Sequence, residues 1–509
     1  MVVHAAAGPD PRRWWGLTAL ALSVLLVTAD NTVLALAIPS LAEDLDPSPT
    51  EMLWIGDAYS FVLAGLLVTM GNVGDRYGRK RLLFTGLVAF ATLSAVAAFS
   101  PNALALILAR AAMGVAGATL MPSTLSIIRN TFHEPRERRI AVGVWTAMGA
   151  VGAGLGPLIG GVLLEHFWWG SVFLVNVPVV AVVLVIGFWS VRESRNPVKA
   201  PIDAISVVLS IAGIFATVAA FKELAINGAG HPTAWGIGGF GLLCLGLFIR
   251  RQLHLDHPLV DIRLFRIPAF AGAAVADTLS AFGLIGVYFF LAQNFQFVDG
   301  DSPLVAGVAL LPGEVAAVLA APVSAYVMAR RGRRLAICSG LVLGGAGLAL
   351  ISLVPTDNPL WISGALIFVG FGFGLSLTGT GDAIMASAPP ERAGAAAAVS
   401  ETAYELGAAL GIAVLGTVLT SWYRYAIVVP PGLPVQAEAD LTESISSAFQ
   451  TAMTLPTSVA AQVLDAARTA FSSAFSVTCI SASFVMFLAA VLSFRVLPSR
   501  ANESDVPAE

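Results

Sequence analysis

Apolar segments of about 20 residues recur along nearly the whole chain, and they constrain its fold more than any other feature. The hydrocarbon core of a bilayer is roughly 30 Å thick, and a helix of about 20 residues spans it. Only 12% of the 509 residues are charged and 57% are hydrophobic, whereas a soluble domain carries roughly 25% charged residues. We therefore expect an all-α integral membrane protein.

Fourteen segments have the length and hydropathy of spanning helices. Their approximate ranges are 15–39, 52–72, 82–100, 103–128, 140–163, 170–191, 202–224, 233–250, 268–296, 303–329, 335–354, 359–386, 395–423 and 468–495. The stretch 425–467 is rich in Pro, Ser, Thr and Ala, and we expect an outer loop there that can carry short amphipathic helices. The alternative is twelve spanning helices with two further helices buried or on the surface.

Basic residues gather in every second loop between these segments. In the fourteen-helix arrangement, nearly all of the 28 Lys and Arg residues fall on one side of the membrane. The opposite turns carry acidic residues, namely Glu43, Asp44, Asp46, Asp299, Asp301 and Asp357. Because cytoplasmic loops are enriched in Lys and Arg, both termini are predicted to be cytoplasmic.

A basic turn in the first half of the chain is repeated in the second half. The stretch from Arg76 to Leu87 is similar to the stretch from Arg330 to Leu341, and both lie between predicted helices. Duplicated halves are typical of transporters that bind substrate between them, although two basic turns can also be similar by chance. We predict two six-helix bundles, at 1–200 and 253–509, with the two helices of 201–252 inserted as a hairpin.

The first copy of this turn has a distinctive polar sequence. It reads Gly71-Asn-Val-Gly74-Asp75-Arg76-Tyr-Gly78-Arg79-Lys80, with glycines that allow close approach of helices. This sequence resembles the signature loop of the major facilitator superfamily. The resemblance implies that Asp75 and Arg79 act in an interhelical charge relay that holds one conformation closed, with Gly71, Arg76 and Gly78 in the same gating element. A loop that only sets the topology is the alternative.

Arg110 lies inside the fourth predicted helix and is followed by Gly114 and Gly117. A full charge at that depth costs at least a few kcal/mol unless it has a partner, so Arg110 marks either function or a buried ion pair. The pattern resembles the fourth-helix motif of the same superfamily. Met113 stands where that family usually has Gln, so the hydrogen bond proposed for the amide does not carry over.

The fifth predicted helix carries Gly152-Ala-Gly154-Leu-Gly156-Pro157-Leu-Ile-Gly160-Gly161. Glycines at four-residue spacing give a smooth face for close packing, and Pro157 removes a backbone hydrogen bond where the helix can bend. The sequence resembles the motif that separates exporters from importers in the superfamily. It favours export, although a plain packing interface would have the same glycines.

Two further helices narrow the resemblance to the 14-helix drug:proton antiporters, especially pumps for quaternary ammonium compounds and dyes. The first helix carries Asp30-Asn31-Thr32-Val33, and the thirteenth carries Glu401-Thr-Ala-Tyr404-Glu405-Leu-Gly407. Met121 to Thr124 and Trp169 to Pro178 extend the likeness, which covers nearly the full chain. Ala35 departs from the common pattern, where Asn is frequent.

Acidic residues outnumber basic ones inside the predicted helices. The acids are Asp30, Asp57, Glu223, Asp277, Glu314, Asp382, Glu401 and Glu405, and the bases are Arg110 and Lys222. Lys222 and Glu223 are adjacent near a helix end, where long side chains can reach outward. The remaining excess of buried acids should favour cations in the pathway, and desolvation favours the protonated carboxyl.

These acids are ranked by their place in the predicted helices. Asp30 is the first candidate for proton exchange, with a structural hydrogen bond as the alternative. Glu401 and Glu405 are one helical turn apart, where like charges repel, and they are expected to couple proton release to cation binding unless they form a pair facing water. Asp57 and Glu314 are candidate substrate contacts.

Four other residues complete these expectations. Tyr59 and Tyr404 are each within three residues of a candidate acid and are candidates for contact with a lipophilic cation, since aromatic faces attract cations. Ordinary packing is the alternative for both. Asp277 and Asp382 are expected deeper in their helices, with a direct role less favoured.

The function predicted from the sequence is export of lipophilic cations in exchange for protons by alternating access. A dedicated exporter of one metabolite, antibiotic or lipid is the alternative. The sequence shows no catalytic triad spacing and no metal-ligand cluster, and Cys244, Cys338 and Cys479 stand singly, so we expect neither an enzyme nor a cofactor. Expected partners are the cargo, protons and the lipids of a bacterial cell membrane, without nucleic acid or an obligate protein partner.

Overall fold

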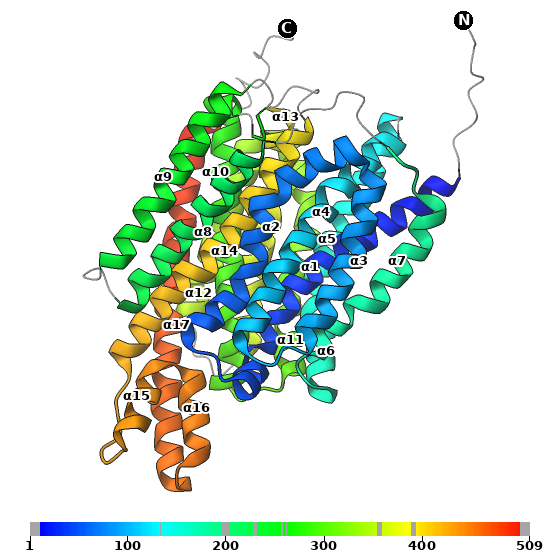
Figure 1. The fold of residues 1–509 in the computed structure, drawn as a ribbon. Helices are drawn as coiled ribbons and strands as arrows, with labels where there is room; N and C mark the ends of the chain where they lie inside the picture. The colour runs from blue at the N-terminus through cyan, green and yellow to red at the C-terminus, as the bar shows by residue number, and fades with distance from the viewer. Residues whose placement is uncertain are drawn as a thin grey trace, which may run out of the picture.

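The computed structural model describes residues 11–132, 134–194, 203–227, 232–255, 258–260, 262–353, 359–387 and 393–498. Within these ranges every regular element is a helix (Figure 1). Twelve helices are long and apolar enough to cross a membrane. The chain is therefore a multi-pass membrane protein, as the recurring apolar segments predicted.

The first half of the chain contains α1 (Arg12–Leu45), α2 (Pro49–Tyr77), α3 (Arg79–Ala98), α4 (Ala103–Thr131), α5 (Pro135–His166), α6 (Ser171–Leu174) and α7 (Asn176–Ser190). Two helices follow, α8 (Ala204–Asn227) and α9 (Pro232–His254). The rest comprises the 3₁₀-helix η1 (Ile262–Arg266), α10 (Pro268–Gln293), the π-helix η2 (Asn294–Val298), α11 (Pro303–Arg331), α12 (Arg333–Leu353), α13 (Pro359–Ala386), α14 (Ala393–Ala426), α15 (Val435–Glu443), α16 (Ile445–Thr454) and α17 (Thr457–Val496). The twelve candidate spans do not include α2 and α8.

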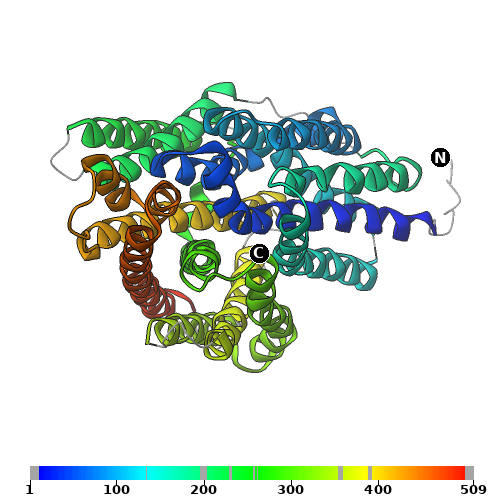
Figure 2. The ribbon, with the colours of Figure 1, turned by 90° about the horizontal axis from the view of Figure 1, so that it is seen from below.

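Figure 2 shows the arrangement of the helices seen from below. Among the described residues, their buried hydrophobic side chains form two large cores and a small third cluster. Phe90, Phe132 and Phe173 are buried in the first core, which is built from α1 to α7. Phe270 and Phe471 are buried in the second, which is built mainly from α10 to α17. We call these two parts the N-half and the C-half.

The two basic turns lie at the end of the bundle where α1 begins and α17 ends, which we call the basic end (Figure 1). Gly78 separates α2 from α3 with a φ of 114°, and Gly332 separates α11 from α12 with a φ of 88°. A side chain rarely adopts such angles. The two copies of the repeated sequence therefore make the same kind of turn.

The opposite end carries α15 and α16, and we call it the cap end (Figure 1). Short helices were expected in this outer loop, but the start of the last spanning helix was predicted too late. It begins at Thr457, not at 468, because Pro456 precedes it and Val463 and Ala467 pack into the core. The polar residues between 457 and 468 lower the local hydropathy, so the hydropathy pattern did not predict this first part of the helix.

Helices α8 and α9 pack against each other, and α8 also packs against α2 and α14. A Cβ on Gly241 would lie 2.6 Å from the Thr217 backbone nitrogen, so glycine is required for this close approach. At the basic end, Arg251 donates to Asp203 from Nε (2.5 Å) and from Nη2 (2.8 Å). These hydrogen bonds lower the pKa of Asp203 to about 2.

We expect Asp203→Asn to lower the melting temperature of the detergent-solubilised protein by about 1–3 °C at neutral pH. Since the folded-state pKa of Asp203 is depressed, the pair stabilises the protein above about pH 4 and stops doing so as the pH falls toward 2. The difference between variant and wild type should therefore shrink below pH 4. Glu43→Gln, which changes an exposed acid near the cap end, is the control, and an equal effect there would contradict the assignment.

Candidate functional site

The two halves meet along two helix pairs, α5 with α11 and α2 with α14. A Cβ on Gly161 would lie 2.7 Å from Leu304 Cα, and one on Gly307 would lie 3.0 Å from the Pro157 carbonyl carbon. In the other pair, a Cβ on Gly416 would lie 3.0 Å from Leu53. All these contacts lie toward the cap end of their helices, so the structure is closed at that end.

The glycine motif of α5 faces two partners. A Cβ on Gly156 would lie 2.9 Å from the Ala29 carbonyl oxygen and collide with the Thr32 hydroxyl, and Gly152 meets Leu25 and Thr28 of α1 in the same way. Pro157 and Gly161 instead face α11 of the C-half. Helix α5 thus packs closely against α1 of its own half on one face and against α11 of the C-half on the adjacent face.

We expect Gly156→Ala to destabilise the protein by about 1–3 kcal/mol and to reduce transport, because overpacking of this kind displaces a helix. Gly143→Ala is the matched control on the same helix, since a Cβ there has nothing within 4 Å. The measurement is thermal unfolding of both purified variants together with transport in vesicles. Equal stability of the two variants would contradict the packing role.

The predicted buried charge of α4 has its partner on α1. Nη1 of Arg110 donates to Oδ2 of Asp30 at 2.7 Å, and the side chains are 1% and 0% exposed. Asp30 is near the middle of α1, so the pair lies deep within the bundle. Removing one partner from such a pair typically costs 3–5 kcal/mol because the other charge is left buried.

Three other groups surround the Arg110 guanidinium. Its Nε donates to the Ile55 carbonyl oxygen at 3.4 Å, and its Cζ lies 4.7 Å from the Tyr59 ring centroid and 5.9 Å from that of Phe173. Tyr59 has no exposed surface, and its hydroxyl has no hydrogen-bond partner among the described atoms. In this conformation Tyr59 packs beside the ion pair, and its role as a substrate contact stays a prediction.

The second oxygen of Asp30 is held by a residue that was not predicted as a site residue. Nδ2 of Asn176, the first residue of α7, donates to Oδ1 of Asp30 at 2.7 Å and to the Ser94 hydroxyl of α3 at 3.2 Å. One signal in the sequence could have pointed to it, because Asn176 lies in the motif from Trp169 to Pro178. That motif marked a resemblance without indicating which side chain faces Asp30.

Glu401 and Glu405 are one turn apart on α14 but have different surroundings. Glu405 is 2% exposed and forms a hydrogen bond with Ser60 of α2, across the interface between the halves. Its Oε2 atom has no hydrogen-bond partner among the described residues. Glu401 is only partly buried and lies near Asp277. Burial of Glu405 at the interface argues against a pair of acids facing water at the outer surface.

Asp277 and Asp382 have separate environments, although the sequence suggested similar depth for both. Asp277 is fully buried and accepts hydrogen bonds from Thr380 (2.9 Å) and Ser400 (3.1 Å). The Asp382 side chain is 49% exposed and accepts a hydrogen bond from Arg333 at the basic end (2.6 Å). The expectation of a deep Asp382 was wrong because the α13 segment continues past the apolar region into the basic end.

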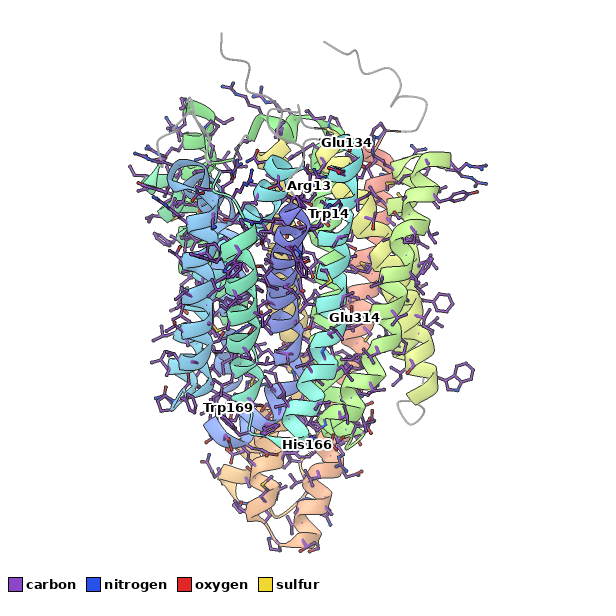
Figure 3. The ribbon with its side chains drawn as sticks, turned by 90° about the vertical axis from the view of Figure 1, so that its right-hand side faces the viewer. Arg13, Trp14, Glu134, His166, Trp169 and Glu314 are labelled. Carbon is purple, nitrogen blue, oxygen red and sulfur yellow. The ribbon has the colours of Figure 1, made fainter. Side chains whose placement is uncertain are left out.

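The two candidate substrate contacts on the second helix of each predicted bundle lie inside the protein. Asp57 is fully buried on α2. Glu314 of α11 faces α5, where a Cβ on Gly154 would lie 3.1 Å from the Glu314 Cβ, and Figure 3 shows it between the two ends of the bundle. The nearby Tyr288 hydroxyl is buried without a hydrogen-bond partner among the described atoms. Tyr404 is partly buried, with its ring 6.4 Å from that of Phe373.

The predicted gating loop lies at the basic end of α2 and α3. Gly71 and Arg76 belong to α2, and Arg79 begins α3, while the side chain of Asp75 lies outside the described part of the structure. The relay between Asp75 and Arg79 therefore stays a prediction. Around Gly78 the close neighbour is the carboxylate of Glu193, which a Cβ on Gly78 would approach to 2.8 Å.

Glu193 was not predicted as part of this loop. It accepts hydrogen bonds from the backbone N–H groups of Lys80 (3.1 Å) and Arg81 (3.3 Å) at the start of α3. A carboxylate at a helix N-terminus satisfies otherwise unpaired donors and interacts favourably with the helix dipole. Its position after α7, in a basic loop, gave no sequence signal for this contact. Among the described residues, no group of three His, Cys, Asp or Glu side chains could hold a metal ion.

Two bundles of membrane helices, closed against each other at one end and holding buried carboxyls on both sides of their interface, define a membrane transporter. A model of the Major Facilitator Superfamily matches residues 20–412. The chain belongs to this superfamily, as its motifs predicted, and so stands among transporters rather than enzymes.

Individual proteins and structures agree with this assignment. The chain is 45% identical to the multidrug efflux pump LfrA of Mycolicibacterium smegmatis over 94% of its length and 95% of that protein. It is 40% identical to the methyl viologen resistance protein SmvA of Salmonella typhimurium over 94% of its length and 97% of that protein. A crystal structure of a bacterial homologue of the human lysosomal transporter Spinster matches with a TM-score of 0.66 and 17% identity, covering 97% of this chain and 100% of that one.

Proposed function

We propose that this protein exports lipophilic cations, such as quaternary ammonium compounds, dyes and some antibiotics, in exchange for protons by alternating access. The observation that carries the proposal is the buried pair of Asp30 and Arg110, with further carboxyls buried in the opposite half. We propose that the exchange uses no bound cofactor and that the proton gradient supplies the energy.

The fourteen-helix topology is part of the proposal. Helices α2 and α8 have 29 and 24 residues, which is enough to cross a bilayer. Residues 1–200 and 253–509 would form the two six-helix bundles, with α8 and α9 of 201–252 as an inserted hairpin. The packing of α8 on both α2 and α14 supports this place between the bundles. The basic end would then face the cytoplasm of a bacterial cell, with both termini there.

A cationic cargo follows from the balance of buried charge. Four acidic residues are fully or almost fully buried, namely Asp30, Asp57, Asp277 and Glu405. Among the described residues, Arg110 is the one basic residue that is buried. Asp57, Glu314 and Tyr404 would contact the cargo, and Glu401 together with Glu405 would couple proton release to its binding. Methyl viologen, to which SmvA gives resistance by its name, is an organic dication, so this cargo class fits a relative as well.

Protonation and cargo binding would exclude each other through Arg110. A proton on Asp30 removes the anion that Arg110 pairs with, while Glu405 of the C-half lies close enough to act electrostatically on Arg110. The guanidinium would then bias the charge at Glu405, where a cation can bind. A change on one half thus reaches the other half through a single side chain.

A narrower function on the same scaffold is also supported by one comparison. The chain is 34% identical, over 82% of its length, to the tetracenomycin C resistance and export protein of Streptomyces glaucescens. A dedicated antibiotic exporter would have one good substrate. A panel of cationic dyes and neutral antibiotics in a host lacking its own pumps distinguishes the two functions.

We expect Asp30→Asn to abolish proton-gradient-driven uptake of ethidium into inverted vesicles, because the amide cannot exchange a proton. Because the substitution also leaves the buried Arg110 charge without its anion, the amount of folded variant in the vesicles is measured beside the uptake and used to normalise it. The measurement is dye uptake at a series of external pH values. Transport with a wild-type pH profile in this variant would rule out Asp30 as the proton carrier.

Glu405→Gln should weaken binding of a cationic dye about tenfold, because it removes one buried negative charge at the interface. Asp382→Asn is the matched control, since it neutralises an exposed acid of the same half at the basic end. Binding is measured by fluorescence titration of the purified proteins. The role of Glu405 would be refuted if both variants bound the dye as the wild type does.

A further inference from the structure

The motif from Trp169 to Pro178 has no role in the transport cycle proposed above. Within it, Asn176 is 3% exposed and opens α7, facing α1 and α3. Both hydrogen bonds of its amide nitrogen are directed into the proton site, one to Asp30 Oδ1 (2.7 Å) and one to Ser94 Oγ (3.2 Å). Asn176 therefore contacts the carboxyl that the proposed function relies on.

The two oxygens of Asp30 have chemically different partners. Oδ2 faces Arg110, and Oδ1 faces Asn176. Among the described residues, the charged or titratable groups that face Asp30 are Arg110 of α4 and Tyr59 of α2, and Glu405 of α14 acts on both of these. The neighbouring helix α5 presents glycines and the backbone around them to α1.

Arginine has only hydrogen-bond donors, so Arg110 suits the carboxylate and cannot accept from a protonated carboxyl. The side-chain amide of Asn176 carries both two donors and an acceptor. After rotation by half a turn, its oxygen can accept from an O–H on Oδ1 of Asp30. The Ser94 hydroxyl is both donor and acceptor, so it can accompany either orientation of the amide.

We propose that Asn176 is a positioning residue for proton exchange: it directs the proton to Oδ1 of Asp30 and sets the pH at which transport changes. The inference rests on the proposed role of Asp30. When the proton binds Oδ1, the hydrogen bond from Nδ2 of Asn176 is replaced by one from the new O–H to the amide oxygen, and Arg110 loses its anionic partner. The Ser94 hydroxyl, which accepts from Nδ2 in the charged state, then donates to the amide oxygen instead.

Asn176→Leu tests this inference. It removes a donor from the carboxylate, and hydrogen bonds to a charged group are stronger than those to a neutral one. The anion should therefore lose more than the protonated acid, and the midpoint of the pH profile for ethidium transport should move about one unit toward higher pH. Ser94→Ala, which leaves the amide but removes its anchor, should move the midpoint in the same direction by less.

Asn294→Leu is the matched control, because Asn294 is also fully buried but belongs to η2 in the C-half. It should leave the midpoint at the wild-type value. A purely structural role for Asn176 would lower the amount of folded protein or the maximal rate without moving the midpoint. Wild-type midpoints in both Asn176→Leu and Ser94→Ala would overturn the proposal.

Two further measurements keep the outcomes separable. If Asn176→Leu fails to fold, Asn176→Gln, which displaces the amide by one methylene, takes its place alongside Ser94→Ala, and unshifted midpoints in both again overturn it. If Asp30→Asn transports with a wild-type pH profile, the proposed function fails instead. Loss of transport in Asp30→Asn together with a wild-type profile in the Asn176 variants refutes the inference about Asn176 alone.

Discussion

The ion pair between Asp30 and Arg110 sets the arrangement of the N-half. A guanidinium at this depth is tolerated only when its charge is matched and its donors are used, and three neighbouring helices supply what it needs, with α6 placing the Phe173 ring beside it. Helix α1 brings the carboxylate, and α2 brings the Ile55 carbonyl and the Tyr59 ring. Helix α2 can approach α4 this closely because Gly114 has no side chain, since a Cβ there would lie 2.5 Å from the Tyr59 carbonyl oxygen. The fourth-helix motif is therefore one unit, in which the glycine makes room for the groups that neutralise the arginine.

The buried acids of the two halves accept hydrogen bonds from different kinds of donor. In the N-half a guanidinium holds Asp30, whereas in the C-half hydroxyls of Thr380 and Ser400 hold Asp277, and the Ser60 hydroxyl reaches Glu405 from across the interface. A guanidinium balances the charge of the carboxylate that it pairs with, whereas a neutral hydroxyl only donates a hydrogen bond to it. A carboxylate held by hydroxyls keeps more unsatisfied charge, so a proton or a cation is favoured beside it. In the exchange proposed above, the C-half acids would therefore be the place where a proton or a cation is bound.

Much of this arrangement could be predicted from the sequence, and the rest could not for definable reasons. The position of Arg110 inside a predicted helix predicted a charged partner, because a lone charge in a membrane is too costly. The spacing of Gly152 and Gly156 predicted close helix packing. Asp382 was placed too deep because hydropathy does not show where a long helix leaves the membrane. Asn176 and Glu193 were missed as contacts because a single amide or carboxylate fits many positions, and only the packing of α7 against α1 and α3 brings them to Asp30 and to Lys80.

The cap end is closed by direct contact between the two halves. Gly161, Gly307 and Gly416 lie toward that end, and the absence of their side chains lets helices of the two halves pack closely. Opening of the cap end would have to separate these closely packed helices. The contacts of such an interface break together, because van der Waals attraction falls steeply once a gap forms between the helices. Glu314 and Glu405 lie along the two contacting helix pairs, beside Gly154 and Ser60. A cation or proton bound at these acids changes the charge directly within the surfaces that must part, which is how occupancy of the site can bias which end is closed.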